Sequence, residues 1–188
     1  MPPPVQPFAL IQKHYSPSSE AYHILIVHSV LVANRALEIA RAYQARHAEV
    51  KLDLRFIEEA ALLHDIGIYQ CEAPSIHCFG AEPYIKHGII GREILEREGL
   101  PHHALVCERH TGVGITHEEV IAQKLPLPLR DYVPLSLEEK IICLADRFYV
   151  KNPATLYEPL TVERIAQKVG EYGGAAHVRW QALRGLMD

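Results

Sequence analysis

The stretch LRFIEEAALLHDIGIY, residues 54–69, decides the expected fold and draws attention to one site. Its apolar residues recur at helical spacing and predict a helix that a left-handed turn at Gly67 ends. His64 and Asp65 stand next to each other at the end of that helix. Because adjacent helical residues diverge by about 100°, an imidazole and a carboxylate there converge only on something held at the helix edge, as a metal ion would be.

Helical periodicity continues through most of the chain, and nothing alternates convincingly with period two. Ser16 and Pro17 suit the start of a long helix, because Ser caps free amides and Pro fits the first helical position. Thr116 and Ser136 each precede a Glu by three residues, which is the capping-box pattern. Helices are expected at about 17–46, 54–66, 84–99, 101–110, from 117, at 137–150 and from 161 with breaks at Gly170 and Gly173, and a loop at 69–83. The predicted fold class is all-α, without internal repeats.

The length of 188 residues suits one helical bundle with a sizeable core but is short for two domains. Four prolines among the first seven residues disfavour a helix there, and residues 1–15 are expected to form an extended lead-in. Residues 16–152 would form the domain that carries the site, and residues 153–188 a C-terminal helical extension.

Composition and charge exclude several classes of function. Lys and Arg total 19 against 23 Asp and Glu, and the net charge of -4 offers no general attraction to nucleic acid or anionic lipid. The N-terminus has no signal-peptide pattern, and the longest apolar stretch, residues 24–33, is interrupted by His28 and Ser29. The four cysteines form no C-x-x-C pair and read as reduced thiols. We therefore expect a cytoplasmic protein that binds neither nucleic acid nor membrane.

Several of the 12 histidines lie on helical faces that should point inward. His87, His110 and Asp146 each share a face with apolar residues, and His28 lies at the edge of the first long helix's apolar arc. A single inward His is more often explained by a bond to a backbone carbonyl than by a site. A buried carboxylate, however, requires a cation or a dense hydrogen-bond shell. Together with the adjacent His and Asp of the opening stretch, these side chains form the kind of set from which helical bundles build metal sites.

The order of His28, then His64 and Asp65, then Asp146 resembles the HD superfamily of metal-dependent phosphohydrolases, and HDIG at residues 64–67 resembles its HDIG branch. The stretches RHTGVGIT, residues 109–116, and YVPLSLEEKIICLADRF, residues 132–148, are also similar to small stand-alone archaeal and bacterial HDIG proteins. The resemblance spans about residues 22–149 and implies a helical phosphohydrolase fold.

The resemblance also implies a binuclear site with six protein ligands. One metal would be held by His28, His64, Asp65 and Asp146, with Asp65 bridging as the catalytic carboxylate, and the second metal would take His87 and His110. Imidazole and carboxylate ligands suit Fe, Mn, Zn, Co or Ni without distinguishing among them. Two such ions about 3.5–4 Å apart activate a shared water and clamp the oxygens of a phosphoryl transfer.

A phosphorylated substrate would need donors beyond the metals. Thr111 begins a glycine-containing turn whose amides suit an anion. Charged residues beside inward positions more often lie on a solvated face, yet they are the nearest candidates in sequence. The residues expected to bind substrate are Arg109, Lys140, Arg147 and Thr111, and the expected partner is a small phosphorylated compound such as a nucleotide.

The sequence differs in two ways from HD branches whose substrates are known. The cyclic-di-GMP phosphodiesterase branch carries a GYP signature and usually a Lys after HDIG, whereas Ile68 follows here and no GYP occurs. The site also resembles small dinucleoside tetraphosphate hydrolases with a di-iron centre, although those typically lack the HDIG ending. Two other classes of function stay open, namely a degenerate metal-binding or ligand-sensing HD module and an oxygen-using di-iron oxygenase on the same scaffold.

Overall fold

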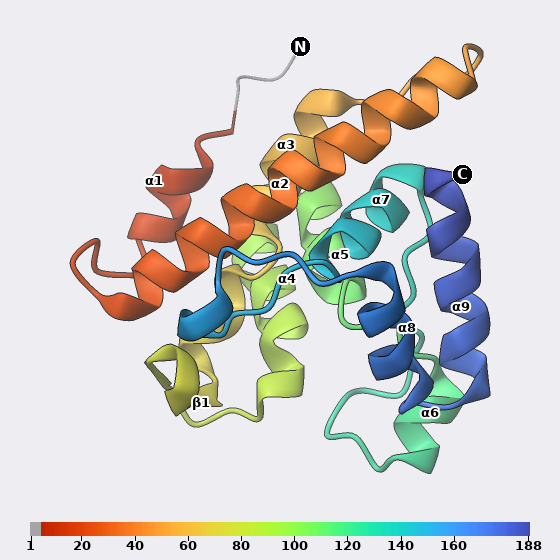
Figure 1. Cartoon of the computed structure of the whole chain (residues 1–188). Helices are drawn as coiled ribbons and strands as arrows, with labels where there is room; N and C mark the ends of the chain where they lie inside the picture. Colours follow the sequence, from red (N-terminus) through yellow and green to blue (C-terminus); the bar gives the residue numbers. More distant parts are fainter. Residues whose placement is uncertain (1–4) are drawn as a thin grey trace.

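The computed structural model describes residues 5–188, which form a helical bundle with short 3₁₀ helices and one small hairpin (Figure 1). The α-helices are α1 Pro7–Gln12, α2 Glu20–Arg46, α3 Leu54–Leu63, α4 His87–Arg97, α5 Pro101–Arg109, α6 His117–Ala122, α7 Leu137–Asp146, α8 Val162–Gly170 and α9 Gly174–Arg184. The 3₁₀ helices are η1 Ile66–Gln70, η2 Pro74–Ile76, η3 Tyr84–Lys86, η4 Pro153–Thr155 and η5 Gly185–Met187, and β1 Glu72–Ala73 pairs antiparallel with β2 Cys78–Phe79. The predicted all-α fold class is confirmed.

The long helix α2 crosses the molecule and packs against α3 and α7 (Figure 1). Ser19 caps its N-terminus by accepting a hydrogen bond from the backbone of Tyr22 at 3.2 Å. By length and composition α2 could also cross a membrane, but 56% of its most apolar window is buried within the fold. Its apolar face is therefore accounted for by packing.

The interior consists of two hydrophobic clusters that meet along α2 and α3. On α2, Leu25 belongs to one cluster and Val32 to the other, and His28 lies between them. On α3 the change of cluster falls between Leu62 and Leu63, directly before His64. The polar residues of the predicted site therefore lie where the two apolar clusters adjoin.

The N-terminal segment differs from the expected lead-in. Residues 1–4 lie outside the described residues, but Pro7–Gln12 is helical and Ile11 is fully buried. Pro7 is the first residue of α1, where its missing N–H and fixed φ are suited to a helix start. The prediction of extended chain over residues 1–15 is therefore wrong from Pro7 onward.

Two predicted helix ends also need correction. The helix expected from residue 17 begins at Glu20, because Ser19 and not Ser16 provides the cap. The helix expected over 137–150 ends at Asp146, after which the chain turns, and Tyr149 N donates to the Asp146 carbonyl. This earlier ending places residues 147–152 beside the site rather than along a continuing helix.

Gly67 plays a different role from the predicted one. It does not adopt a positive φ, and the chain continues past it as η1. A Cβ atom at this position would lie 2.3 Å from the backbone oxygen of His87 and 2.5 Å from the backbone nitrogen of Gly91. Gly67 therefore allows the start of α4 to approach η1 closely, which brings His87 toward Asp65.

We predict that Gly67→Ala lowers the free energy of unfolding by about 2 kcal/mol or more, because both clashing partners are backbone atoms. The matched control is Gly170→Ala, since no atom lies within 4 Å of a Cβ built there. The control should leave stability unchanged or raise it slightly. Urea unfolding followed by circular dichroism measures both, and equal stability of the two variants would contradict the close packing at Gly67.

Candidate metal site

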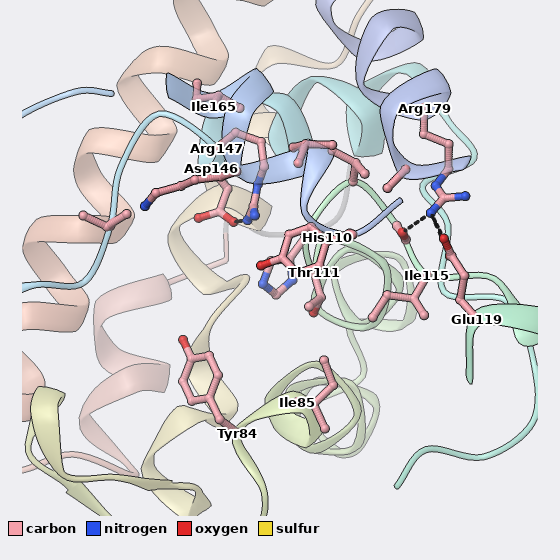
Figure 2. A pocket seen from close by; sticks show the side chains of 18 of the residues that line it. Tyr84, Ile85, His110, Thr111, Ile115, Glu119, Asp146, Arg147, Ile165 and Arg179 are labelled. Atoms are coloured by element: carbon pink, nitrogen blue, oxygen red, sulfur yellow. Dashed lines mark hydrogen bonds and ion pairs between the residues drawn. The ribbon is translucent and has the colours of Figure 1, made fainter. Parts of the chain in front are cut away.

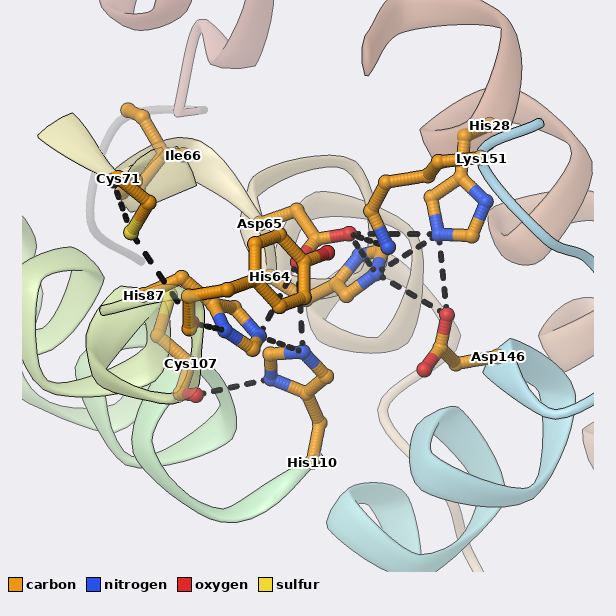
Figure 3. A network of polar contacts seen from close by, with 12 residues as sticks. His28, His64, Asp65, Ile66, Cys71, His87, Cys107, His110, Asp146 and Lys151 are labelled. Atoms are coloured by element: carbon orange, nitrogen blue, oxygen red, sulfur yellow. Dashed lines mark hydrogen bonds and ion pairs between the residues drawn. The ribbon is translucent and has the colours of Figure 1, made fainter. Parts of the chain in front are cut away.

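The predicted metal-binding side chains converge from separate helices onto one buried cluster (Figure 3). His28 comes from the N-terminal half of α2, and His64 and Asp65 follow the last turn of α3. His87 is the first residue of α4, His110 directly follows α5, and Asp146 ends α7. All six side chains are buried. The structure thus brings together every residue expected to hold metal.

Four of these residues form one set of possible ligand atoms. Asp65 Oδ2 lies 3.0 Å from His64 Nε2 and 3.3 Å from His28 Nε2. Asp146 Oδ1 lies 3.0 Å from His28 Nε2 and 3.5 Å from His64 Nε2. The set combines carboxylate oxygens with imidazole nitrogens, a mixture that suits a divalent transition metal.

The remaining two histidines face the other oxygen of Asp65. His87 Nε2 and His110 Nε2 each lie 3.4 Å from Asp65 Oδ1 and 3.1 Å from each other. Asp65 therefore directs one carboxylate oxygen to each set. This is the arrangement expected of a carboxylate that bridges two ions.

Backbone carbonyls orient these rings. His87 Nδ1 donates to the Tyr84 carbonyl at 2.7 Å, and His110 Nδ1 donates to the Cys107 carbonyl at 2.8 Å. Burial lowers the pKa of His87 to about 4 and also lowers the pKa of His110, so both rings are neutral near pH 7. With the proton on Nδ1, both Nε2 atoms present lone pairs to each other across 3.1 Å. Two facing lone pairs repel, and a cation between them turns the repulsion into coordination.

The other charges of the cluster point to the same conclusion. Neither Asp65 oxygen makes a hydrogen bond of acceptable geometry, although nitrogens surround both. Burial alone would raise the pKa of Asp65, but Lys151 and His64 outweigh it and hold the pKa well below its usual range. Burial also opposes a charge on His64, yet Asp65 and Asp146 raise its pKa to about 9. The residues fit a divalent metal, because the cluster holds fixed negative charge and unshared nitrogen lone pairs on buried side chains.

Lys151 belongs to this cluster although no sequence pattern indicated it. Its Nζ lies 2.6 Å from Asp65 Oδ2, and its side chain is only 13% exposed. Burial would lower the pKa of Lys151, but Asp65 raises it above its ordinary value, so the ammonium is charged. A helix continuing to residue 150 would have carried Lys151 past the site. Its approach depends on the end of α7 at Asp146, and only knowledge of that ending could have revealed it.

A cavity of about 530 Å³ opens beside the second set of possible ligands, which consists of Asp65, His87 and His110 (Figure 2). His110, Asp146, Arg147 and Lys151 lie at its polar end. The loop after α7, α8 and α9 also line the cavity, with the apolar side chains of Leu160, Ile165, Val169 and Ala176 and with Lys168, Tyr172 and Arg179. The C-terminal helices therefore contribute directly to the space in front of the cluster.

Two of the four residues expected to bind substrate line this cavity, and two do not. Thr111 and Arg147 line it, and Arg147 is also paired with Asp146 Oδ2. Arg109 and Lys140 are absent from the lining. Arg109 lies 3.2 Å from Glu139, and the same carboxylate accepts from the backbone of Leu135. Because this pairing directs Arg109 to the start of α7, its position does not support contact with a substrate in the cavity.

Two cysteines and one exposed group of side chains could also bind metal by residue type, but they lie outside the buried cluster. Cys107 and Cys143 are buried, and their thiols lie near backbone carbonyl oxygens rather than in the cluster. Burial raises the pKa of Cys143 to about 12, which disfavours the thiolate. A third group of His117, Glu118 and Asp131 is exposed, and Asp131 there accepts a bond from the backbone of His117.

Comparison with known proteins places this arrangement in a family. The family model for the HD domain matches residues 25–150. The solved HD domain of the phosphodiesterase PgpH from L. monocytogenes superposes with a TM-score of 0.51 at 17% identity, covering 95% of this chain and 94% of that one, which shows a shared fold.

Three sequence relatives match over most of this chain but over less of their own length. An uncharacterised protein of Methanocaldococcus jannaschii is 39% identical over 123 residues, 65% of this chain and 64% of the relative. Proteins named tRNA (cytidine(56)-2'-O)-methyltransferase from Picrophilus torridus and Thermoplasma volcanium are 38% and 35% identical, covering 69% and 66% of this chain. The chain spans only 32% and 31% of those two proteins. The family match covers more than half of the chain and includes all six clustered residues. The chain belongs to the HD domain family.

Proposed function

We propose that this protein is a metal-dependent phosphohydrolase that uses two divalent ions to hydrolyse a small phosphoester, such as a nucleotide. The observation that carries this proposal is the position of Asp65, with Oδ2 facing His28 and His64 and Oδ1 facing His87 and His110. One ion would be held by His28, His64, Asp65 and Asp146, and the other by Asp65, His87 and His110. Ions bound there would supply an activated water and positive charge for a phosphoryl group.

The residues around the cluster support this chemistry. Arg147 pairs with Asp146 Oδ2 and leaves Oδ1 directed at His28 and His64. The carbonyls of Tyr84 and Cys107 keep the Nε2 atoms of His87 and His110 directed inward. Asp146, His87 and His110 are thus each held by a second interaction, which orients them before substrate arrives.

The cavity supports a substrate with one charged and one apolar part. Beside the cluster it is lined by Arg147, Lys151 and the turn that begins at Thr111, and its lining also includes apolar side chains such as Ile165 and Val169. A phosphoryl group would lie beside the cluster, and the organic group would contact these apolar side chains. A degenerate binding module would not require six ligands each oriented toward a shared centre.

The proposed activity is tested by reconstituting the protein with Mn²⁺, Fe²⁺, Co²⁺, Ni²⁺ or Zn²⁺ and screening nucleotide and other phosphoesters for release of phosphate or of a new phosphomonoester. Metal-dependent turnover of at least one compound is expected. Anaerobic and aerobic assays run in parallel separate hydrolysis from oxygen-dependent chemistry. Metal-loaded protein that turns over none of the phosphoesters would contradict the proposal.

Asp65→Asn should lower phosphoesterase activity at least about a hundredfold, comparable to the loss of one strong electrostatic contributor. The substitution keeps the shape of the side chain but removes the charge shared by both sets. Asp131→Asn is the matched control, because Asp131 is exposed and lies in neither buried set. Steady-state kinetics with circular dichroism measures both variants, and activity of Asp65→Asn within a fewfold of wild type would exclude a bridging role.

Replacing His87 and His110 together by Ala should leave about one metal ion per chain, because the set that contains His28 stays complete. His103→Ala is the control, since His103 is buried but pairs with Glu59 away from the cluster. Elemental analysis of reconstituted, desalted protein gives the metal content. Equal loading of the double variant and wild type would remove these two residues from the site.

Metal affinity should rise with pH between about 6.5 and 8.5. In metal-free protein the pKa of His64 is raised to about 9, so the ring is protonated throughout this range and must lose its proton to bind metal. Competition with one proton makes affinity rise by about tenfold per pH unit below that pKa. Calorimetric titration with Mn²⁺ in buffers of different ionisation enthalpy measures affinity and proton release, and an affinity independent of pH would contradict a charged His64.

A further inference from the structure

Lys151 places a charged ammonium group between the metal cluster and the cavity. Its Nζ lies 2.6 Å from Asp65 Oδ2, and the residue lines the cavity (Figure 3). Lys is among the residues least often buried, and a buried ammonium requires a counter-charge. Asp65 is the carboxylate paired with it in the described structure.

This pairing conflicts with the role proposed for Asp65. Oδ2 of Asp65 is also the oxygen that faces His28 and His64, so an ion in that set and the ammonium of Lys151 act on the same atom. Two cations at one carboxylate oxygen repel each other. When metal is bound, the charge of Lys151 therefore requires another anion within its reach.

The other cations at the cavity already have partners or lie farther from the cluster. Arg147 pairs with Asp146, and Arg179 contacts Glu119 Oε2 at 2.7 Å and the Gly114 carbonyl at 3.1 Å. Lys168 belongs to α8, on the wall formed by the C-terminal helices. Arg147 and Lys151 both contact the cluster and line the cavity, but Arg147 leaves Asp146 Oδ1 to His28 and His64, whereas Lys151 contacts the Asp65 oxygen that faces these two histidines.

Resting on the proposed function, we propose that Lys151 binds the phosphoryl group of the substrate when metal occupies the site and neutralises Asp65 when it does not. The flexible four-carbon stem of Lys suits a small movement of its ammonium from the carboxylate to a phosphate oxygen. Residues 149–152 belong to no helix, so the backbone there does not lock the side chain against α7. Metal binding would thus prepare the anion site by releasing Lys151 from Asp65.

The test uses Lys151→Met, which keeps an unbranched chain and removes the charge, and Lys151→Arg, which retains charge. Lys51→Met is the matched control, because Lys51 is exposed and its replacement by Met changes the net charge by the same amount. Two quantities are measured by calorimetry on each folded variant, namely Mn²⁺ affinity of the metal-free protein and affinity of the Mn²⁺-saturated protein for inorganic phosphate. Neither requires turnover.

Lys151→Met should bind Mn²⁺ more tightly, by about tenfold, because a competing cation is gone. The same variant should bind phosphate at least about tenfold more weakly, because a charge-assisted hydrogen bond is lost. Lys151→Arg should keep phosphate affinity within a fewfold of wild type, and Lys51→Met should change neither quantity. A merely structural Lys151 would not move the two affinities in opposite directions.

Unchanged phosphate affinity in Lys151→Met, or weaker Mn²⁺ binding, would overturn this inference. If Lys151→Met does not fold, the inference rests on Lys151→Gln measured in the same way. Should wild-type protein hydrolyse no phosphoester while the two opposite shifts are observed, the proposed hydrolysis fails but the anion site at Lys151 stands. Conversely, full phosphoesterase activity with unchanged phosphate affinity in Lys151→Met would overturn the role of Lys151 and leave the proposed function intact.

Discussion

The buried carboxylate of Asp65 is the constraint on which the rest of this structure depends. It has no exposed surface, and burial of an ionised carboxylate is costly unless positive charge or hydrogen-bond donors surround it. The chain meets that requirement with His28 and His64 at one oxygen, His87 and His110 at the other, and Lys151 beside them. Besides α3, the helices α2, α4, α5 and α7 must each pass or end close to the two carboxylate oxygens of Asp65. The packing of these helices brings their ligands together.

Small residues make the convergence possible on the side of the second set. A Cβ at Gly67 would clash with the backbone of α4, and a Cβ at Gly88 would lie 2.5 Å from the Cys107 carbonyl oxygen of α5. These contacts let η1, α4 and α5 approach at backbone distance. His87 and His110 consequently face each other across 3.1 Å. The C-terminal helices then close the region, because Ile165 and Trp180 pack in the same apolar cluster as α2 and α7 while Ile165 also lines the cavity.

Much of the cluster could be predicted from the sequence, because several of its residues lie on or directly after apolar helical faces and their order resembles the HD superfamily. Periodicity identifies inward positions such as His87 and His110, and the adjacent His64 and Asp65 mark the edge of a helix. Lys151 could not be identified in this way, since it lies outside any helix and its approach follows from a turn after Asp146. Arg109 was expected to bind substrate because it is adjacent to His110, but it pairs with Glu139 instead. Its place in the sequence does not reveal a partner thirty residues later. Periodicity identifies the faces of helices, whereas ion pairs between distant residues also depend on where helices end and which ends meet.

Anomalous diffraction from crystals of protein loaded with a divalent transition metal tests the central claim most directly. The account predicts two buried anomalous peaks. One lies within about 2.0–2.3 Å of ligand atoms of His28, His64 and Asp146, the other at the same distance from His87 and His110, and Asp65 contacts both ions. Anomalous signal confined to the exposed group of His117, Glu118 and Asp131, with none in the buried cluster, would contradict it.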